Sequence, residues 1–416
     1  MTSTEKSAWT WLAADLLCKK ITKGTTPPKS AISDTGSVPF LRVNNLIVGG
    51  SKALYGKLIY VDDHTSKTIL KRSIAYPNDV LMNIVGPPLG KITILDDSFC
   101  EYNLNQAIII FRGYSARIDS NFLYYYLASE VAQEWFEARA KKTSGQKNLT
   151  IELCKEIPIP CPPLSEQRRI VDILSTWDKA IETTERLLAN AEVYKRALFQ
   201  QLLTGKRRLK GFEGSERPKK HLRDVAKVIV SNVDKKTISD EMPVRLCNYT
   251  DVYERDFIVP AQDFMSATAT PEQARKFRLR ADDVIITKDS ETADDIAKPT
   301  YVLETADNLI CGYHLAIIRP GKDADGRYLK FFFELPRTRH YFGTRANGAI
   351  RYGLTIDGIE GAEIRLPPIE EQKRIAAVLV AAEEAISHFR REMHFLKTEK
   401  TSLMRQLLTG KKRGTV

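Results

Sequence analysis

The sequence predicts a mixed α+β fold of the α/β class, in which two similar globular domains alternate with two long helices that pair as an antiparallel coiled coil. Three observations support this prediction: a basic octapeptide that occurs twice, a long apolar repeat before each copy, and short strand-like runs elsewhere. A chain of 416 residues is also too long for one ordinary core and suits two or more domains.

The octapeptide marks the end of a duplicated segment. Residues 201–208 read QLLTGKRR and residues 406–413 read QLLTGKKR. The same displacement along the chain brings PPLSEQRRI (162–170) onto PPIEEQKRI (367–375), and no gap is needed between these motifs. Two unrelated helices would not share a register of this length, so the chain contains an internal duplication with pseudo-twofold character.

Between the motifs, apolar residues recur at alternating steps of four and three, which predicts a coiled-coil seam. Lys195 and Lys400 interrupt the two seams at the same place. Trp177 is the best candidate for an interface anchor, although it also suits the space left by its repeat mate Ala382. We expect most of the seam to join the two helices and part of it to contact partner subunits. The seam comprises Ile170, Leu174, Trp177, Ile181, Leu188, Leu198, Leu202, Ile375, Leu379, Ile386, Phe389, Met393, Leu396, Leu403 and Leu407.

The sequence contains start and stop signals for both helices. A Pro-Pro pair stops the preceding segment, Ser165 is a favourable N-cap where Glu370 is a poorer one, and Gly205 and Gly410 suit left-handed positions after the last turn. Each helix covers about 39 residues, or roughly 58 Å. The predicted domain plan is globular 1–157, helical 158–208, globular 209–362 and helical 363–416.

The globular segments duplicate more weakly. VPFLRVNN (38–45) is similar to MPVRLCNY (242–249), and FLYYYL (122–127) is similar to YLKFFF (328–333). Short runs such as FLRV, DVLMNIV and AIIIF, or VRLC, DVIITK and LAIIR, predict strands with aromatic-rich helices between them. The two aromatic runs favour core packing over base stacking, because the two copies keep bulk rather than exposed polarity.

Charge and motifs limit the function. The net charge of +11 and the pI near 9.2 favour a polyanionic partner, most often nucleic acid. Gly86-Pro87-Pro88-Leu89 lacks both ends of an adenine-methyltransferase tetrapeptide, and GPPLGKI (86–92) has the wrong spacing for a phosphate loop. The cysteines and histidines do not combine at zinc-ligand spacing. We therefore expect no catalytic residues, no metal site and no cofactor bound by this chain.

The helix motifs PP[LI]xEQ[RK]RI and QLLTGK, alternating with two variable domains, resemble the specificity (S) subunit of type I restriction–modification enzymes. The resemblance covers essentially the whole chain. It implies two target-recognition domains that each read half of a split duplex DNA site, and a coiled coil that spaces them and binds two methyltransferase subunits. It also implies S-adenosylmethionine in those adenine-methylating partners, ATP and Mg²⁺ in up to two restriction subunits, and a prokaryotic cytoplasmic location.

Base reading needs Arg or Lys for guanine and Asn or Gln for adenine, on loops that reach a groove. We expect part of the following set to contact DNA, many of them at phosphates rather than at bases. The candidates are Arg42, Asn44, Asn45, Asn83, Lys91, Gln146, Lys147 and Asn148 in the first domain, and Arg245, Asn248, Tyr249, Lys288, Arg345, Asn347 and Arg351 in the second.

Two other classes of function compete with this reading. A coiled-coil scaffold that binds only protein would explain the helices but not two divergent domains in a basic chain. A self-contained nuclease or methyltransferase would need motifs that the sequence does not show, although a nuclease site can be built from scattered carboxylates and a lysine.

Overall fold

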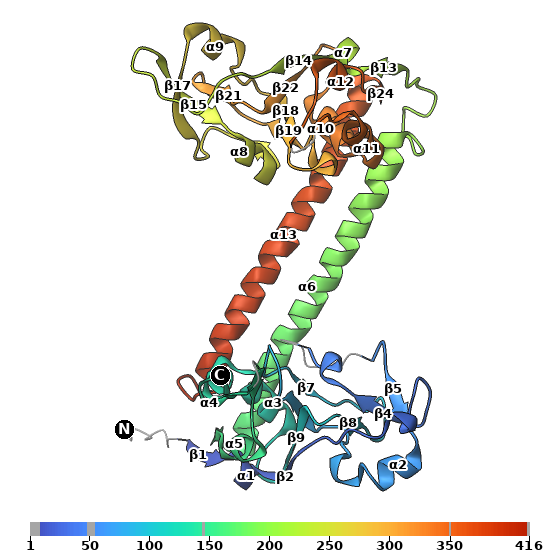
Figure 1. Cartoon of the computed structure of the whole chain (residues 1–416), viewed down its shortest axis with the longest axis vertical. Coiled ribbons are helices and arrows are strands. Elements are labelled where there is room, and N and C mark those ends of the chain that lie inside the picture. Colours follow the sequence, from blue (N-terminus) through green and yellow to red (C-terminus); the bar gives the residue numbers. More distant parts are fainter. Residues whose placement is uncertain (1–8, 48–54, 144–145, 349–350, 414–416) are drawn as a thin grey trace. The chain divides into compact units, whose positions relative to one another are not determined.

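The computed structural model describes residues 9–47, 55–143, 146–348 and 351–413 (Figure 1). The chain forms two compact units. Unit 1 joins Met1–Glu185 to Arg391–Val416, and unit 2 is Arg186–Arg390. Each unit therefore combines one globular domain with part of both long helices. Among the described residues, no helix is both long and apolar enough to cross a membrane.

The globular domain of unit 1 contains two four-stranded sheets, in the orders β2-β9-β6-β7 and β3-β5-β4-β8. The first sheet is antiparallel throughout, and α3 packs against it. The strands are β1 (Thr10–Ala13), β2 (Cys18–Lys23), β3 (Ile32–Ser33), β4 (Val38–Leu41), β5 (Ile59–Val61), β6 (Val80–Asn83), β7 (Ile92–Ile94), β8 (Asn103–Leu104), β9 (Ile108–Gly113), β10 (Lys141–Thr143), β11 (Gln146–Asn148) and β12 (Pro158–Cys161). The helices are α1 (Ala14–Leu17), α2 (Asp63–Lys67), α3 (Ser120–Ala128), α4 (Glu130–Arg139) and α5 (Ile151–Glu156).

The globular domain of unit 2 repeats this plan with a five-stranded sheet in the order β14-β22-β18-β20-β16 and a three-stranded sheet in the order β17-β15-β21. The strands are β13 (Lys219–His221), β14 (Ala226–Val230), β15 (Met242–Cys247), β16 (Phe257–Ile258), β17 (Met265–Ala269), β18 (Val284–Thr287), β19 (Asp289–Ser290), β20 (Pro299–Val302), β21 (Leu309–Cys311), β22 (Leu315–Pro320), β23 (Tyr352–Gly353) and β24 (Glu363–Arg365). The helices are α7 (Leu222–Val225), α8 (Tyr249–Glu254), α9 (Pro271–Lys276), α10 (Gly326–Glu334), α11 (Pro336–Arg345) and α12 (Ile356–Glu360).

The duplication predicted from the sequence is visible in this element order. In both domains a short hairpin-like pair closes the domain, β1 with β12 and β13 with β24. Each predicted strand run overlaps a strand, although Arg42 and Val43 of FLRV lie beyond the end of β4, and α3 and α10 occupy matching places in the chain order. Tyr124–Tyr126 and Phe331–Phe333 are all buried, which confirms core packing over base stacking.

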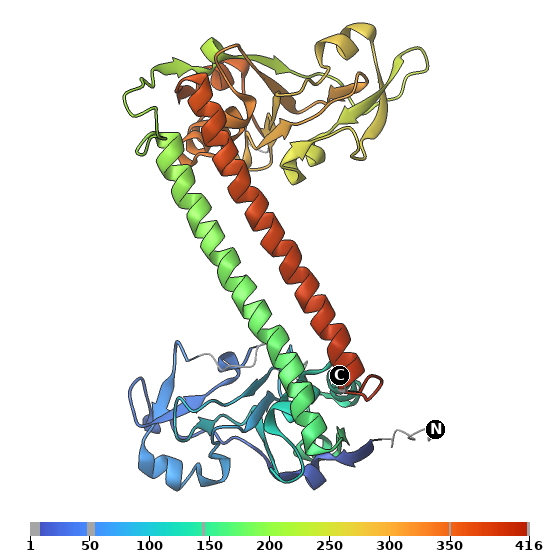
Figure 2. The same cartoon turned by 180° about the vertical axis from the view of Figure 1, so that it is seen from behind.

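The long helices are α6 (Leu164–Thr204) and α13 (Ile369–Leu407). In unit 1, ion pairs join Asp178 to Lys400 and Glu185 to Lys397. As the residue numbers increase along α6, the numbers of their partners on α13 decrease. Unit 2 repeats this order with Lys195–Glu383 and Glu192–Arg390. Within each unit the two helices are therefore antiparallel, as predicted, and they run side by side in both views (Figure 2).

The seam is buried unevenly. Its outer residues are buried in the domain cores: Ile170, Leu174 and Leu407 in unit 1, and Leu198, Leu202, Ile375 and Leu379 in unit 2. Residues nearer the middle of the helices, such as Trp177, Leu188, Met393 and Leu396, are only half-buried. A pair of helices covers one stripe of each partner, so the middle of the seam keeps exposed apolar surface.

The predicted helix starts need a correction. α6 begins at Leu164, and the backbone N–H groups of Glu166 and Gln167 both donate to the carbonyl of Pro163. Ser165 therefore lies in the first turn and is not the N-cap, because the second proline already accepts the first helical hydrogen bonds. α13 likewise starts at Ile369, one residue before Glu370. Gly205 and Gly410 have φ of 77° and 73°, the left-handed values that were predicted.

A fully buried glutamine fixes each helix start to its domain. Gln167 donates to the carbonyls of Arg117 and Pro162 and accepts from the N–H of Asp119. Gln372 makes the same three bonds in unit 2, to Asp323, Pro367 and Asp325. Asp119 and Asp325 are the N-caps of α3 and α10, so each glutamine joins its long helix to the main helix of the domain.

The glutamate before each glutamine forms an ion pair with an arginine that follows the opposite helix. The guanidinium of Arg208 donates twice to the buried carboxylate of Glu371, at 2.9 and 2.7 Å. Arg413, the matching residue of the second octapeptide, pairs with Glu166 at 3.0 Å. Burial acts to raise the pKa of Glu371, but Arg208 and Arg217 hold it below its ordinary value, so this carboxylate stays charged.

We expect Gln372→Ala to lower the free energy of unfolding by about 3 kcal/mol, because it leaves buried backbone groups without partners. Thermal unfolding of the full chain measures this as a fall in the midpoint temperature. Gln201→Ala removes an exposed glutamine from α6 and is the matched control. Equal midpoints for the two variants would show that the buried hydrogen bonds do not stabilise the fold.

Candidate nucleic-acid interface

In unit 1, a proline- and glycine-containing loop and a short hairpin lie together. The N–H of Gly86 donates to the carbonyl of Lys147, and Val85 forms a bridge with Asn148. This brings three sequence-predicted positions, Lys91, Lys147 and Asn148, to one edge of the domain. Lys147 forms an ion pair with Glu137. Gln146 lies in the same hairpin, but its side chain is outside the described part of the structure.

Asn83 has a different role from the one predicted for it. Its side chain is fully buried, donates to the carbonyls of Val85 and Pro88, and accepts from the N–H of Lys91. These bonds use both amide hydrogens and the oxygen, so the side chain holds the loop closed. Thr287 does the same in unit 2, where its hydroxyl accepts from the N–H of Lys298.

This equivalence identifies a basic position that sequence reasoning missed. Lys91 and Lys298 both follow the loop that the buried polar residue closes. The Nζ atom of Lys298 lies 3.7 Å above the ring of Tyr253, and that tyrosine donates to Asp295. The hydrogen bond to Asp295 raises the pKa of Tyr253, so the hydroxyl remains protonated. The loop in unit 2 is longer, which shifted the sequence match to Lys288.

The predicted residues Arg42, Asn44 and Asn45 form a short 3₁₀ turn after β4. Arg42 and Asn44 are exposed. Asn45 is buried, and its side-chain oxygen accepts from the N–H of Arg42. The exposed pair is therefore presented by a turn that Asn45 stabilises.

In unit 2, the predicted residues around β19 and β23 come together. β19 pairs with β23, Asn347 forms a bridge with Gly353, and the N–H of Leu354 donates to the carbonyl of Lys288. Arg351 and Asn347 are exposed, and Arg345 is exposed at the end of α11 with its guanidinium over the Tyr341 ring.

Two residues that were not predicted support this surface. Asp289 accepts from Lys288 at 2.8 Å and contacts the Nδ1 atom of His314 at 2.5 Å. His314 has φ of 72°, which turns the chain toward β19. Sequence alone gave no signal for this pair, because the two residues are far apart along the chain.

The remaining predicted residues of unit 2 are less available. Arg245 donates to the carbonyls of Pro260 and Gln262 and lies over the ring of Phe264. Asn248 is buried at the start of α8. Tyr249 is half-buried next to Ser290, and burial raises its pKa. Of the basic and amide residues around this surface, Arg345, Asn347 and Arg351 are exposed, whereas Lys288 and Lys298 are half-buried.

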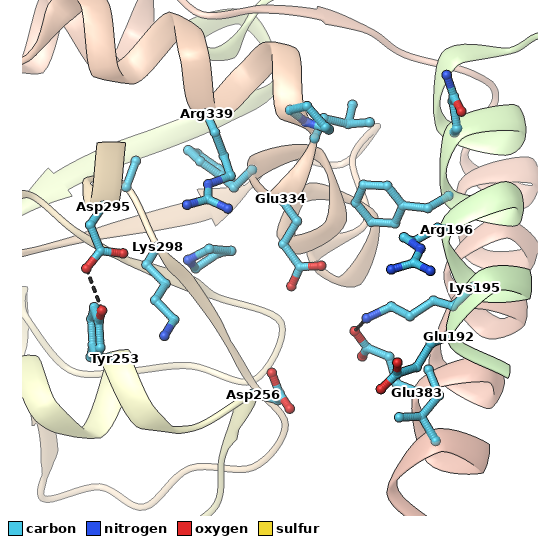
Figure 3. A pocket seen from close by; sticks show the side chains of 18 of the residues that line it. Glu192, Lys195, Arg196, Tyr253, Asp256, Asp295, Lys298, Glu334, Arg339 and Glu383 are labelled. Carbon is cyan, nitrogen blue, oxygen red and sulfur yellow. Dashed lines mark hydrogen bonds and ion pairs between the residues drawn. The ribbon is translucent and has the colours of Figure 1, made fainter. Parts of the chain in front are cut away.

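A cavity of about 1210 Å³ lies within unit 2 (Figure 3). On one side it is lined by Tyr253, Lys298 and Arg339 of the globular domain, and on the other by Lys195 and Glu383 of the long helices. Cationic and acidic side chains alternate around it, so it does not have the one-signed charge of a phosphate-binding cleft.

The fold and the candidate surfaces of the two units define a class of protein. Two similar globular domains are joined to a pair of antiparallel helices, in a chain with a net positive charge. Residues 15–193 match the family described as the type I restriction modification DNA specificity domain. A protein described as the MjaX type I restriction enzyme specificity subunit of Methanocaldococcus jannaschii is 26% identical over 384 residues, covering 90% of this chain and 87% of that protein. The EcoDI specificity subunit of Escherichia coli is 25% identical over 200 residues, covering 47% of this chain and 40% of that protein.

Solved structures agree with this fold over nearly the whole chain. The S subunit of a type I restriction–modification system from M. genitalium has a TM-score of 0.60 at 15% identity and covers 98% of both chains. The HsdS subunit of Thermoanaerobacter tengcongensis has a TM-score of 0.54 at 17% identity, covering 99% of this chain and 100% of that one. Over most of its length the chain is therefore similar to specificity subunits of type I restriction–modification systems. The reading as a scaffold that binds only protein is not favoured.

We expect Arg351→Ala to weaken duplex binding by the assembled complex at least fivefold, since a lost base or phosphate contact costs about 1–3 kcal/mol. Fluorescence anisotropy across a salt series measures both the affinity and its salt slope. Arg275→Ala removes the same charge from the exposed surface of α9 and serves as the control. If both variants bind alike, only the net charge matters and Arg351 lies outside the interface.

Proposed function

We propose that the two globular domains are target-recognition domains, and that each reads one half of a split, asymmetric duplex site. One observation carries this proposal. The two globular domains have the same fold, but different side chains lie on their matching surfaces. Asn83 and Thr287 close matching loops, yet the neighbouring polar residues differ: Lys147 and Asn148 in unit 1, Lys288 and Arg351 in unit 2. Domains that share a frame but differ at their contact surface suit two different half-sites.

The basic balance of the chain supports the same proposal. Phosphate attraction gives each domain affinity without sequence information, and base contacts add the discrimination. Joining two weak readers on one helix pair makes the second contact intramolecular, which raises the effective concentration. In this proposal the outward residues identified above, with Arg42 and Asn44, approach the DNA, while Asn45, Asn83, Arg245 and Asn248 shape the loops that carry them.

We further propose that this chain is not itself catalytic and that two methyltransferase subunits dock on the helix pair. The exposed apolar residues of the helices support this: Leu187 and Tyr194 lie two turns apart on α6, and Phe395 is on α13. The methyltransferases would bring S-adenosylmethionine and methylate adenine. Restriction subunits, up to two, would bring ATP and Mg²⁺. The natural location is the cytoplasm of a prokaryote, where the DNA substrate is found.

A methylome tests this function directly. The chain is expressed with its methyltransferase partner in a host that lacks adenine methylation, and methyladenine is mapped by single-molecule sequencing. We expect a split, asymmetric motif that is absent when this chain is omitted. A soluble, assembled complex that yields no motif would overturn the recognition proposal.

The helices also predict the spacing of the half-sites. Inserting four residues, one helical turn, at matching seam positions of α6 and α13 lengthens the helix pair by about 5–6 Å. We expect the unread spacer to grow by about one or two base pairs at 3.4 Å each. The same methylome gives the spacer length, and an unchanged spacer in an active complex would show that the helices do not set it.

A further inference from the structure

The two lysines that interrupt the apolar seams reach across to the opposite helix. In unit 1 the Nζ atom of Lys400 lies 2.5 Å from Asp178, and in unit 2 the Nζ atom of Lys195 lies 2.7 Å from Glu383. The displacement that relates the two octapeptides also relates Lys195 to Lys400 and Asp178 to Glu383. The interruption of the seam is therefore one ion pair, built twice.

Each of these carboxylates is also held by the globular domain of its own unit. The hydroxyl of Tyr125 on α3 donates to Asp178 at 2.6 Å. The ammonium group of Lys330 on α10 donates to both oxygens of Glu383, at 3.1 and 3.2 Å. We call each carboxylate, with its lysine and its domain-side donor, a domain anchor.

The two domain anchors use different residues to make the same connection. α3 and α10 are matching helices with aspartate N-caps, Asp119 and Asp325. Counted from those caps, Tyr125 matches Phe331, and Lys330 matches Tyr124. The contact to the carboxylate thus comes from neighbouring positions with different chemistry, a hydroxyl in one domain and an ammonium in the other. Both domains keep a hydrogen bond to the carboxylate although the donor residue differs. This indicates that the contact itself has a function.

The anchors are well buried on the domain side. Tyr125 is 5% exposed and Lys330 is 3% exposed. Burial raises the pKa of Tyr125, and its hydrogen bond to Asp178 adds to this, so the hydroxyl stays a donor. Burial acts to lower the pKa of Lys330, but Glu334 and Glu383 hold it above its ordinary value. Tyr125 and Lys330 therefore both keep the protons that they donate, as a buried polar connection requires.

The anchor of unit 2 lies where close packing ends. Leu198 and Leu202 are buried in the core that the helices share with the globular domain. One turn from Leu198, Lys195 lines the cavity shown in Figure 3, opposite Tyr253 and Lys298 of the domain. The apolar core therefore holds the domain at the helix end, and the open cavity leaves room for the domain to tilt. The Lys195–Glu383–Lys330 contact, at the edge of that cavity, opposes this tilt.

We propose that Asp178 and Glu383 are positioning residues that hold each target-recognition domain at one angle to the helix pair, and so determine how strictly the spacer length of the DNA site is enforced. The proposal rests on the proposed function. It assigns no base contact to either carboxylate. Loss of an anchor relaxes the spacing between half-sites and leaves the bases of each half-site unchanged.

The test is the methylome of complexes that carry Tyr125→Phe or Glu383→Gln. The measured quantity is methylation of sites whose spacer is one base pair longer or shorter, divided by methylation of the wild-type site. We expect this ratio to rise roughly tenfold, the effect of losing one hydrogen bond to a charged group. A general loss of stability or activity lowers both terms and leaves the ratio unchanged.

Two matched controls break exposed ion pairs that join the two helices to each other. Lys397→Gln removes the pair with Glu185, and Arg390→Gln removes the pair with Glu192. We expect both to keep the wild-type ratio. Tyr125→Phe removes a single hydroxyl, so it decides the matter if Glu383→Gln does not assemble.

The outcomes separate the two proposals. A wild-type complex that produces no split motif contradicts the proposed function. A wild-type complex with a split motif, and anchor variants that keep its strict spacing, overturns the anchor proposal alone. Relaxed spacing in the anchor variants and in both controls would also overturn it, because helix pairing in general would then set the spacing.

Discussion

Antiparallel pairing of α6 with α13 is the constraint on which the other features of each unit depend. It brings the arginine at the end of one helix to the glutamate at the start of the other, Arg208 to Glu371 and Arg413 to Glu166. The neighbouring glutamine, Gln167 or Gln372, then connects that helix start to the N-cap loop of α3 or α10. The fully buried charge of Glu371 needs its partner in place, so helix pairing and domain docking are coupled in unit 2, and the partly buried Glu166 repeats the arrangement in unit 1.

The same constraint explains why the motifs sit at the helix ends. The glutamate and glutamine of EQRR and EQKR both make internal contacts, the glutamate to the segment after the opposite helix and the glutamine to the domain. The last arginine of each octapeptide completes the first of these contacts. The middle of the helices carries no such requirement, and there the surface keeps exposed apolar side chains such as Tyr194 and Phe395.

The fold was predictable from the sequence, because a gap-free repeat of apolar residues over two long segments has few physical explanations. The site was predictable only in outline. Asn83 belongs to a residue type and a loop that suit base reading, yet all of its hydrogen-bonding groups are used internally. The sequence comparison did not identify Lys298, because the loop in unit 2 is longer and places Lys298 out of register with Lys91. Contacts such as Asp289 with His314 depend on chain folding, and no local pattern encodes them.

The two ion pairs nearer the middle of the helices have a further consequence. Glu185 pairs with Lys397, and Arg390 pairs with Glu192, although the repeat relates Glu185 to Arg390 and Glu192 to Lys397. The sign of charge is thus exchanged between the two copies. Pairing α6 with a second α6 would bring two glutamates together, and pairing α13 with a second α13 would bring together an arginine and a lysine. Like charges repel, so these side chains disfavour the pairing of α6 with α6 or of α13 with α13. They favour the pairing of α6 with α13.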